Sequence, residues 1–445
     1  MAQLIEVGSG SSGGSAVVGP GNVVFVDPIL GNDGTGQRGN AAKPFATFNA
    51  ALGVVQSGDT VMLSPGTHVV TGAPYPPYPA LSSLTIAGYG RDVTVLAGGP
   101  GCIPIQASVG TIVDSLVVQD MNVTSDVRCI EATGATAARR FMPTTGTIGG
   151  VKLSRVRLGG AAGFSIAYCR QFILDDVICD AQGNIIDTSG ALGYSATIDG
   201  LTCSDLNVRW DNDSPDAPAN PGFPFGPSRS PVTIRDSFAT GYFSLELQPA
   251  VVVERGCVMG IVTAGPGGLT EALSGAVPSI QFAGRILGSI DFTGGAALPD
   301  SISAGNYTFQ DVEMGVGTSA AFGRAGTVNG RSTVYMLGTT WPLTGGNLVA
   351  QDGVDVFSES GTSPTYSTTN LATITPKHWT ANPVAAPAGA TIVPFGWNAF
   401  SAPTNVLVSA NAAGCDACVT ARAANAVTVT VAAPCSVDVR CEWGT

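Results

Sequence analysis

The sequence predicts an all-β protein: a parallel β-helix with a helical cap at its N-terminal end, followed by a C-terminal antiparallel β-sandwich. Three observations predict this fold class: a recurring eight-residue apolar pattern, a helix-like segment before the repeats, and strand-like alternation after them. The rival all-β interpretation is a sandwich with ordinary hairpins. Hairpins, however, need not repeat one spacing around one bend.

The repeated pattern is apolar-any-apolar-any-any-apolar-any-apolar, as in Tyr307, Phe309, Val312 and Met314. Two period-2 apolar pairs separated by two residues describe two short strands that meet at a bend and point into one interior. The bends hold short polar residues or glycine, which suit tight turns. Ten copies start at residues 84, 116, 151, 172, 196, 232, 251, 280, 307 and 334. This loose period is typical of a solenoid whose loops vary while its strands stack.

Composition narrows the function classes. The 445 residues are long enough to bury a core without metals or disulfides. Only 12% of them are charged, against about 25% in an ordinary soluble protein. No apolar run approaches the ~18 residues of a membrane-spanning helix, so we expect no membrane insertion. The net charge of −12 leaves no basic stripe for a nucleic acid, which we do not expect as a partner.

Residues 1–21 are rich in glycine and serine, and we expect a flexible N-terminal arm. It is either an expression linker or a natural arm that docks the protein onto a larger particle. The N-terminus shows neither the basic nor the apolar region of a secretory signal, so we expect a cytoplasmic product with mostly reduced cysteines. Cys179 and Cys203 share the eighth position of successive copies, and we expect packed free thiols there in preference to a disulfide.

The segment before the repeats predicts an N-terminal cap. It contains an expected strand at 23–26, a Gly/Asn/Asp-rich loop at 27–39, a helix at 44–55 and a strand at 60–63. Pro44 suits the start of that helix, and Phe45, Phe48, Leu52 and Val55 have helical spacing. Because a solenoid end exposes unpaired strand edges, we expect this helix to plug the open end.

The same segment carries a resemblance. Its motifs are Val-Asp-Pro-x-x-Gly-Asn-Asp-Gly-Thr-Gly at 26–36, Lys-Pro-Phe-x-Thr at 43–47, Ala-Ala-Leu at 50–52, Gly-Asp-Thr-Val at 58–61 and Pro-Gly-Thr at 65–67. As a set they resemble the opening segment of the pectate-lyase-like, right-handed parallel β-helix superfamily. The resemblance implies the fold. That superfamily includes polysaccharide lyases and hydrolases, bacterial surface proteins, and bacteriophage tailspikes and fibres, so the activity stays open.

The predicted domain order is therefore an arm at 1–21, a capped β-helix at 22–342, a linker at 343–375 and a sandwich at 376–445. The linker range is rich in Gly, Ser, Thr and Asn, and is either a spacer or an extended chain that wraps a neighbour. Alternation at 404–408, 417–420, 426–431 and 435–443 predicts hairpin-connected strands. This module resembles the C-terminal domains of phage and marine-virus structural proteins.

The best candidate for sugar chemistry is a loop after the copy that starts at 196. Paired carboxylates beside an aromatic ring are typical of a glycosidase or of a glycan-binding groove. We take them as candidate glycan contacts and assign no catalytic residue. The competing interpretation is an ordinary turn-rich loop. The candidates are Trp210, Asp211, Asp213 and Asp216.

A second candidate is a ladder of corner carboxylates that neighbouring coils could bring together to hold Ca²⁺. Lyases of the superfamily pair Ca²⁺ with a basic proton acceptor, and Arg170 and Arg209 are the nearest arginines. We favour the simpler interpretation, that these carboxylates cap turns. The ladder would consist of Asp175, Asp176, Asp180, Asp199 and Asp205.

Other metal sites are disfavoured, and we expect no cofactor. His68 and His378, the two histidines, lie in different regions, which argues against a histidine-based triad or zinc site. Cys415 and Cys418 form a C-x-x-C pair, but the following pair, Cys435 and Cys441, has five intervening residues where a zinc ribbon has two.

Together these observations predict a bacteriophage virion protein: a tail spike, a tail fibre or a capsid decoration that contacts host surface glycans. We expect a homotrimer, because a low-charge surface suits side-by-side packing of solenoids, with other virion proteins bound through the N-terminal arm. The monomer with a neutral surface is the alternative assembly. Alternative functions are a polysaccharide lyase or glycoside hydrolase, and a capsid-stabilising module without a ligand.

Overall fold

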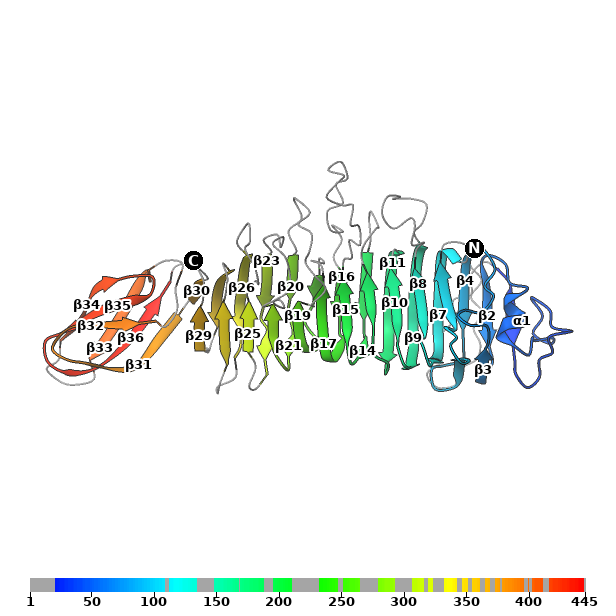
Figure 1. The fold of residues 1–445 in the computed structure, drawn as a ribbon, viewed down its shortest axis with the longest axis horizontal. Helices are drawn as coiled ribbons and strands as arrows, with labels where there is room; N and C mark the ends of the chain where they lie inside the picture. Colours follow the sequence, from blue (N-terminus) through cyan, green and yellow to red (C-terminus); the bar gives the residue numbers. More distant parts are fainter. Residues whose placement is uncertain are drawn as a thin grey trace, which may run out of the picture. The chain divides into compact units, whose positions relative to one another are not determined.

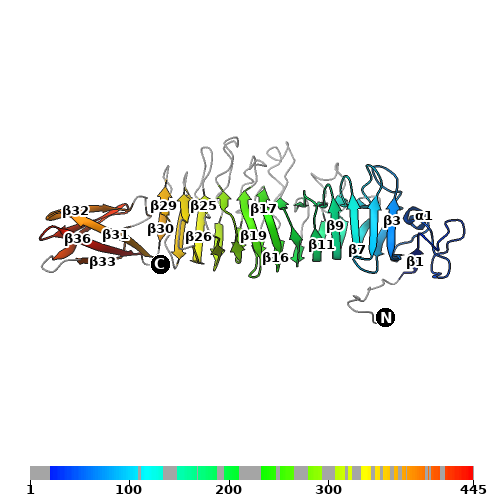
Figure 2. The same ribbon diagram turned by 90° about the horizontal axis from the view of Figure 1, so that it is seen from below.

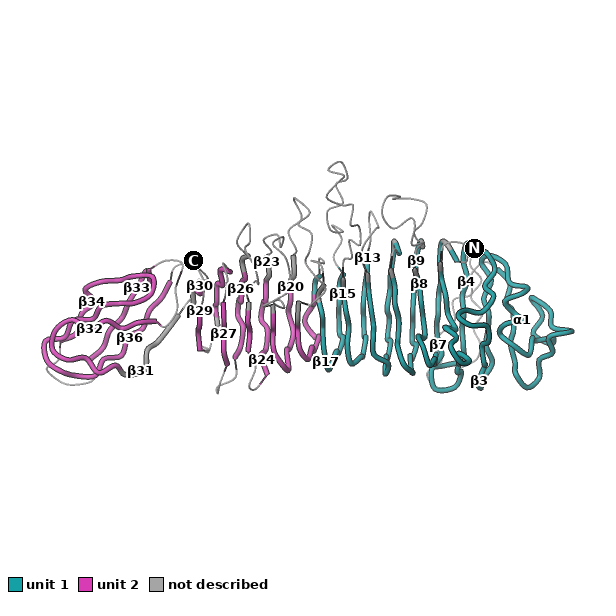
Figure 3. Tube along the Cα trace, viewed as in Figure 1, with its two compact units in different colours: residues 1–252 teal, residues 253–445 magenta. Residues whose placement is uncertain are grey.

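The computed structural model describes residues 21–108, 112–133, 148–167, 169–187, 195–209, 232–246, 251–264, 279–292, 306–315, 319–322, 332–341, 346–350, 354–360, 365–368, 373–376, 378–395, 399, 402–410 and 416–443. The chain forms two compact units, Met1–Val252 and Val253–Thr445 (Figure 3), which we describe separately. No helix in the described ranges is long and apolar enough to cross a membrane.

The first unit is a stack of three-sided coils, seen as side-by-side strands in Figure 1. In one coil, strand β9 (Ile148–Gly160) bends at Arg155 and so supplies two sides, while β10 (Phe164–Ala167) supplies the third. The next coil repeats this with β11 (Cys169–Cys179) and β12 (Ile185–Asp187). β9 pairs in parallel with β11, and β10 with β12. This is a parallel β-helix, as the sequence predicts.

The other elements of the first unit are β1 (Val23–Val26), α1 (Phe48–Leu52), β2 (Asp59–Leu63), β3 (Gly66–Val70), β4 (Leu81–Ala87), β5 (Thr94–Gly98), β6 (Ile105–Ser108), β7 (Ile112–Ser125), β8 (Ile130–Thr133), β13 (Ser195–Asp199), β14 (Thr202–Cys203), β15 (Leu206–Arg209), β16 (Val232–Arg235) and β17 (Phe238–Glu246). Strand β18 (Val251–Val253) lies at the boundary of the units.

Pairing of the strands confirms the eight-residue pattern position by position. The first residues of successive copies are direct partners: Leu84 with Leu116, and onward through Val151, Phe172, Ala196 and Val232. Third positions pair in the same way, so that Leu153, Leu174, Ile198 and Ile234 form one column, each fully buried. Removing such a side chain from water contributes about 1.5–3 kcal/mol. The column therefore supplies much of the stability of the stack.

Most of the bends contain one residue in the left-handed region. Among the residues that the structure describes, five non-glycine residues have positive φ, and all five occupy the fifth position of a copy: Asp120, Arg155, Asp176, Asp236 and Asp311, with φ of 43 to 56°. Glycine takes the same position at Gly200 and Gly338, with φ of 69° and 62°. Left-handed backbone costs a non-glycine residue about 1–2 kcal/mol, less for aspartate. The stack therefore retains a bend whose geometry opposes the preference of the residues that make it.

The cap helix is shorter than the predicted 44–55 segment, because α1 begins at Phe48. The backbone N–H of Phe45 donates to the carbonyl of Phe25, and its carbonyl accepts from the N–H of Asp27. This holds Phe45 in an extended bridge, so the helix cannot start there. Thr47 caps the helix, its hydroxyl accepting from the N–H of Ala50. The predicted apolar set is nonetheless buried as expected.

A buried carboxylate organises the cap. Asp59, fully buried, accepts hydrogen bonds from the Arg38 guanidinium at 2.6 and 2.7 Å. It also accepts from the backbone N–H groups of Asn22 and Gln56. Burial opposes the charged form, but the guanidinium and the two N–H groups outweigh it and hold the pKa of Asp59 below its usual value. The aspartate of the Gly-Asp-Thr-Val motif thus ties loop 27–43 to the first coil.

The second unit contains further coils of the same kind. Their strands are β19 (Val258–Ala264), β20 (Ser279–Phe282), β21 (Arg285–Ile286), β22 (Ile290–Phe292), β23 (Asn306–Gln310), β24 (Glu313–Met314), β25 (Ser319–Phe322), β26 (Ser332–Thr339), β27 (Asn347–Ala350), β28 (Val354–Ser360), β29 (Thr365–Thr368) and β30 (Thr373–Pro376). The pattern again sets the register: Ile280 pairs with Tyr307, and Tyr307 with Val334.

The linker predicted at 343–375 is corrected by the structure. Strands β27 to β30 lie there, and they continue the parallel pairing: Val334 with Val356, and Val356 with Ile374. Val356 and Ile374 are buried like their partners in earlier coils. The sequence disguises these coils because their strands are short and the residues between them are mostly polar or small, so that the apolar pattern is interrupted.

The predicted C-terminal sandwich is present as two three-stranded antiparallel sheets (Figure 2). One has the order β31 (His378–Ala386), β36 (Cys435–Glu442), β33 (Asn405–Ala410), and the other β32 (Gly389–Pro394), β35 (Ala426–Val431), β34 (Ala417–Arg422). Strands β31 and β32 were not predicted. The register of β31 shifts between Ala381 and Val384, next to Pro383, and this interrupts the alternation that marks a strand.

The cysteines largely match the expectation. Cys179 and Cys203 are register partners, and both are buried free thiols. Burial raises the pKa of Cys179 to about 12 and also raises that of Cys203. Cys435, in the sandwich, is disulfide-bonded.

Replacing a column residue should destabilise the protein strongly. For Leu174→Ala we expect a loss of about 2–5 kcal/mol in the free energy of unfolding, because a cavity opens between Leu153 and Ile198. Ile173→Ala, one residue away but facing outward, is the control and should cost under about 1 kcal/mol. Urea unfolding followed by circular dichroism measures both. Equal losses in the two variants would contradict the stacked column.

Acid should weaken the cap through Asp59. A carboxyl whose folded pKa lies below its unfolded value contributes stability above the unfolded pKa, and loses it as the pH falls through the folded pKa. We therefore expect amide hydrogen exchange in β1 and β2 to accelerate below about pH 4. In Asp59→Asn, exchange should be faster at neutral pH and should lack this acid-dependent part. An unchanged acid response in the variant would assign it to other groups.

Candidate functional site: the corner surface

A short loop projects from the first clear coil. Residues 88–94 are held by backbone hydrogen bonds, including those from the N–H groups of Gly88 and Gly90 to the carbonyls of Gln119 and Asp120. Gly88 fits only without a side chain, because a Cβ there would lie 2.5 Å from the Asp120 carbonyl oxygen. The loop presents Tyr89 with half of its surface exposed. An aromatic ring is thus fixed on a well-braced turn.

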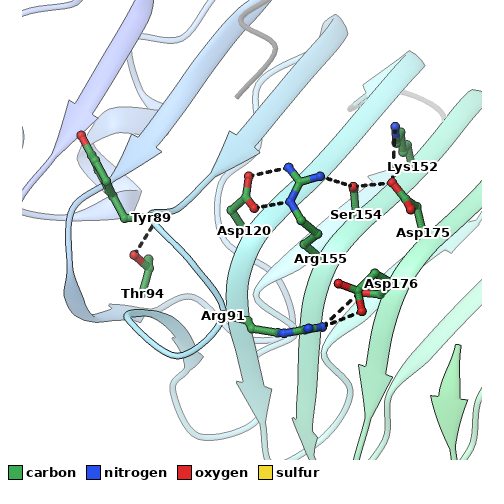
Figure 4. Close-up of polar contacts among 9 residues, drawn as sticks. All are labelled: Tyr89, Arg91, Thr94, Asp120, Lys152, Ser154, Arg155, Asp175 and Asp176. Atoms are coloured by element: carbon green, nitrogen blue, oxygen red, sulfur yellow. Dashed lines mark hydrogen bonds and ion pairs between the residues drawn. The ribbon is translucent and has the colours of Figure 1, made fainter. Parts of the chain in front are cut away.

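Arg91, from the same loop, extends along the bends of the stack (Figure 4). Its guanidinium donates to the Asp176 carboxylate at 3.0 Å and to the Asp176 carbonyl at 3.3 Å. Asp176 belongs to the copy that starts at 172, three coils beyond the copy that starts at 84. One side chain therefore ties the loop to a distant bend.

Beside the Arg91–Asp176 pair, further polar groups form a chain along the bends (Figure 4). Arg155 donates to both carboxylate oxygens of Asp120, at 2.6 and 2.9 Å, and to the hydroxyl of Ser154 at 3.2 Å. That hydroxyl donates to Asp175 at 2.8 Å, and Lys152 lies 4.0 Å from the same carboxylate. We call the set of Tyr89, Arg91, Lys152, Arg155, Asp175 and Asp176, with the buried residues Asp120 and Ser154, the corner surface.

The corner surface offers an exposed aromatic ring, two cations and two carboxylates at the surface of a rigid strand scaffold. Lys152 and Asp175 are each nearly half exposed, whereas the Asp120 side chain is only 11% exposed. Partly exposed charged groups around a ring can donate to and accept from hydroxyl groups while the ring contacts an apolar face. The arrangement is therefore suited to contacts with a polar ligand such as a sugar.

The predicted glycan contacts lie outside the described residues: Trp210, Asp211, Asp213 and Asp216 all fall in the range 210–231. They remain a hypothesis. Arg170 lies on β11 and Arg209 on β15, and their side chains also lie outside the described set.

The acidic ladder forms only in part. Asp175 and Asp199 are register partners, as the sequence suggests. Asp180, however, pairs with Arg157 at 2.6 Å, and Asp205 accepts from the N–H of Gly183 at 2.9 Å. Within the described ranges, no three acidic, histidine or cysteine side chains gather where they could hold a metal ion. Ion pairs and hydrogen bonds thus engage Asp175, Asp176, Asp180 and Asp205.

His68 and the described C-terminal cysteines have the following surroundings. His68 is buried in β3, where burial lowers its pKa and its Nε2 lies 2.8 Å from the Ser64 carbonyl oxygen. Cys418 is exposed on β34, whereas Cys441 is buried on β36 of the other sheet. Cys415 lies outside the described residues.

Sequence reasoning missed the corner surface as a unit. It recognised the bend residues as turn formers, but not that Arg155 would pair with Asp120, 35 residues earlier. The sequence does contain a signal for this pair, because Arg155 and Asp120 occupy the fifth positions of adjacent copies. A cation and an anion at the same position of stacked coils are expected to form an ion pair. Arg91 falls at the eighth position of the copy that starts at 84, where the pattern expects a buried apolar residue, so the pattern gave no signal for its ion pair with Asp176.

No protein-family model matches this chain, and no curated protein matches it. Among solved structures, the chain is similar to a rhamnogalacturonan lyase, with 16% identity and a TM-score of 0.33 over 76% of each chain. It is also similar to the tailspike gp61 of Pseudomonas phage phi297, with 8% identity and a TM-score of 0.29 over 89% of this chain and 91% of that one. At these values neither protein's activity carries over, and the β-helix is established by the pairing of the chain's own strands.

Breaking the inner ion pair should destabilise the first unit. For Arg155→Leu we expect a loss of about 2 kcal/mol, less than for a fully buried pair because the guanidinium is about one third exposed. Arg157→Leu, on the same strand but in an exposed pair with Asp180, is the matched control and should leave the urea midpoint unchanged. Equal shifts would show that the Asp120 environment contributes nothing specific.

Proposed function

We propose that this chain is a structural protein of a bacteriophage virion, a tail spike, tail fibre or exterior decoration, assembled as a homotrimer. The observation that carries the proposal is the register of the coils: within each unit, the first pattern positions of successive coils are direct partners, without a shift. Repeats stacked in this way form a stiff spacer, which is what a projecting particle component requires.

The two ends of the chain fit this role. At the N-terminal side, α1 and the Asp59–Arg38 pair cover the first coil, which limits uncontrolled addition of strands to its edge. Residues 1–21, which precede the cap, are proposed as the arm that binds other virion proteins. After the last coil, the antiparallel sandwich provides a separate folded module.

Contact with host surface glycans is the proposed task of the exposed side chains. The corner surface supports it with the exposed ring of Tyr89 to one side of a row of paired charges (Figure 4). The loop that carries Trp210, Asp211, Asp213 and Asp216 is the second proposed contact. Assembly would take place in the host cytoplasm, and the protein would leave as part of the particle.

The location is tested by immunogold labelling and peptide mass spectrometry of purified particles. We expect the chain in the particles, with gold on projections. Its presence only in the soluble lysate would overturn the proposal.

Binding is tested with capsular and lipopolysaccharide fractions from the host. We expect Tyr89→Ala to weaken binding about tenfold, the effect of losing roughly 1.4 kcal/mol of ring contact. Val93→Ala, an exposed apolar change in the same loop, is the control. Release of unsaturated uronates or new reducing ends, abolished by Asp211→Asn or Asp213→Asn, would instead support the lyase or hydrolase alternative.

A further inference from the structure

One outer face of the sandwich carries no charge. In the sheet β32–β35–β34, Val393, Val427, Val429 and Val431 are buried, so the residues that alternate with them point outward. Register pairs Ile392 with Thr428 on this outer side. We call it the uncharged face; its residues are Ala390, Ile392, Pro394, Cys418, Thr420, Ala421, Ala426, Thr428 and Thr430.

The outer face of the other sheet is different. In β36, Val437, Val439 and Cys441 are buried, so Asp438, Arg440 and Glu442 point outward. Arg440 and Glu442 form an ion pair at 3.4 Å. Two sheets of equal size and similar strand length therefore present opposite surfaces to the outside, one charged and one not. The difference is not required by the sandwich core, which both sheets share.

Two of the three threonine hydroxyls of the uncharged face, those of Thr420 and Thr430, are engaged within the face. The Thr420 hydroxyl lies 3.1 Å from the Thr430 hydroxyl and donates to the Thr428 carbonyl at 3.4 Å. Polar groups that already have partners can leave water at little cost. Methyl groups and internally bonded hydroxyls make a surface suited to burial against protein, while aromatic rings for stacking on a sugar do not occur among its nine residues.

We infer that the uncharged face is the surface through which copies of this chain associate. The net charge of −12 makes two copies repel one another. Contact is then most favourable through a face without charge, which matches the depletion of charged residues from the centres of protein interfaces. Ile392, 68% exposed, is the largest apolar side chain of the face and its proposed central contact. This inference deepens the homotrimer proposed above and rests on it.

The inference is tested on the full chain by light scattering and by labelling of Cys418 with N-ethylmaleimide, read out by peptide mass spectrometry. Cys418 is a free, exposed thiol on the face. We expect the wild type to have a multiple of the 44.8 kDa chain mass. Ile392→Arg should lower the assembled mass and raise the rate of Cys418 labelling at least about tenfold, because the face becomes accessible.

Leu407→Arg is the matched control, since Leu407 is 54% exposed on the outer face of the other sheet and the change adds the same charge. It should leave both measurements unchanged. Thr428→Arg repeats the test at a second position, and circular dichroism verifies folding of each variant. A monomeric wild type, or an assembly that Ile392→Arg and Thr428→Arg leave intact with unchanged labelling, overturns the inference. Immunogold labelling of particles is independent of these measurements. If particles are labelled but the chain is monomeric, only the association through this face is rejected. If the chain assembles but is absent from particles, the proposed function is rejected.

Discussion

The structure depends on one constraint: every coil must repeat the register of the coil before it. Because side chains alternate along a strand, a slip of one residue would turn the whole buried set outward. The column through Leu153, Leu174 and Ile198 shows that no slip occurs there. The single left-handed residue found at most of the bends has the same consequence, since a longer turn would change the number of residues between the two apolar pairs. Retaining a strained aspartate or arginine at this position is the price of constant register.

The sequence was informative wherever this constraint acts and uninformative elsewhere. The copies that start at 116, 151 and 172 carry the eight-residue pattern clearly, and their strands are direct partners in the structure. The third side of each coil was missed because strands such as β10, Phe164–Ala167, are short and follow the bend at variable distances. The linker interpretation of 343–375 failed for a related reason, since its strands have four to seven residues and polar turns. The alternation of apolar and polar residues can be recognised in a sequence only where a strand is long enough to show several repeats.

Interactions along the stack were harder to foresee than the stack itself. Arg155 and Asp120 are distant in sequence, and only the register brings them together. Once the register is known, the residues at the fifth positions of successive copies are known to be neighbours in the stack. An ion pair between oppositely charged residues at these positions can then be predicted. Arg91 is different, because it comes from a loop whose path depends on Gly88 and Gly90 and not on the pattern. A binding surface made partly from such loops is accessible to sequence reasoning only in part.

Low charge has different consequences in the two kinds of domain. In the coils, exposed charges can be paired along the stack, as Arg157 is with Asp180. The surface then carries polar, charged groups without a large net electrostatic potential. In the sandwich, the charged residues of β36 lie on one outer face, while the outer face that carries Ile392 has no charged residue. An acidic protein that places its charges on one side leaves the other side free of the repulsion that would otherwise keep copies apart. Solubility and association can thus be satisfied by two faces of the same small module, provided that the uncharged face is covered once the copies have met.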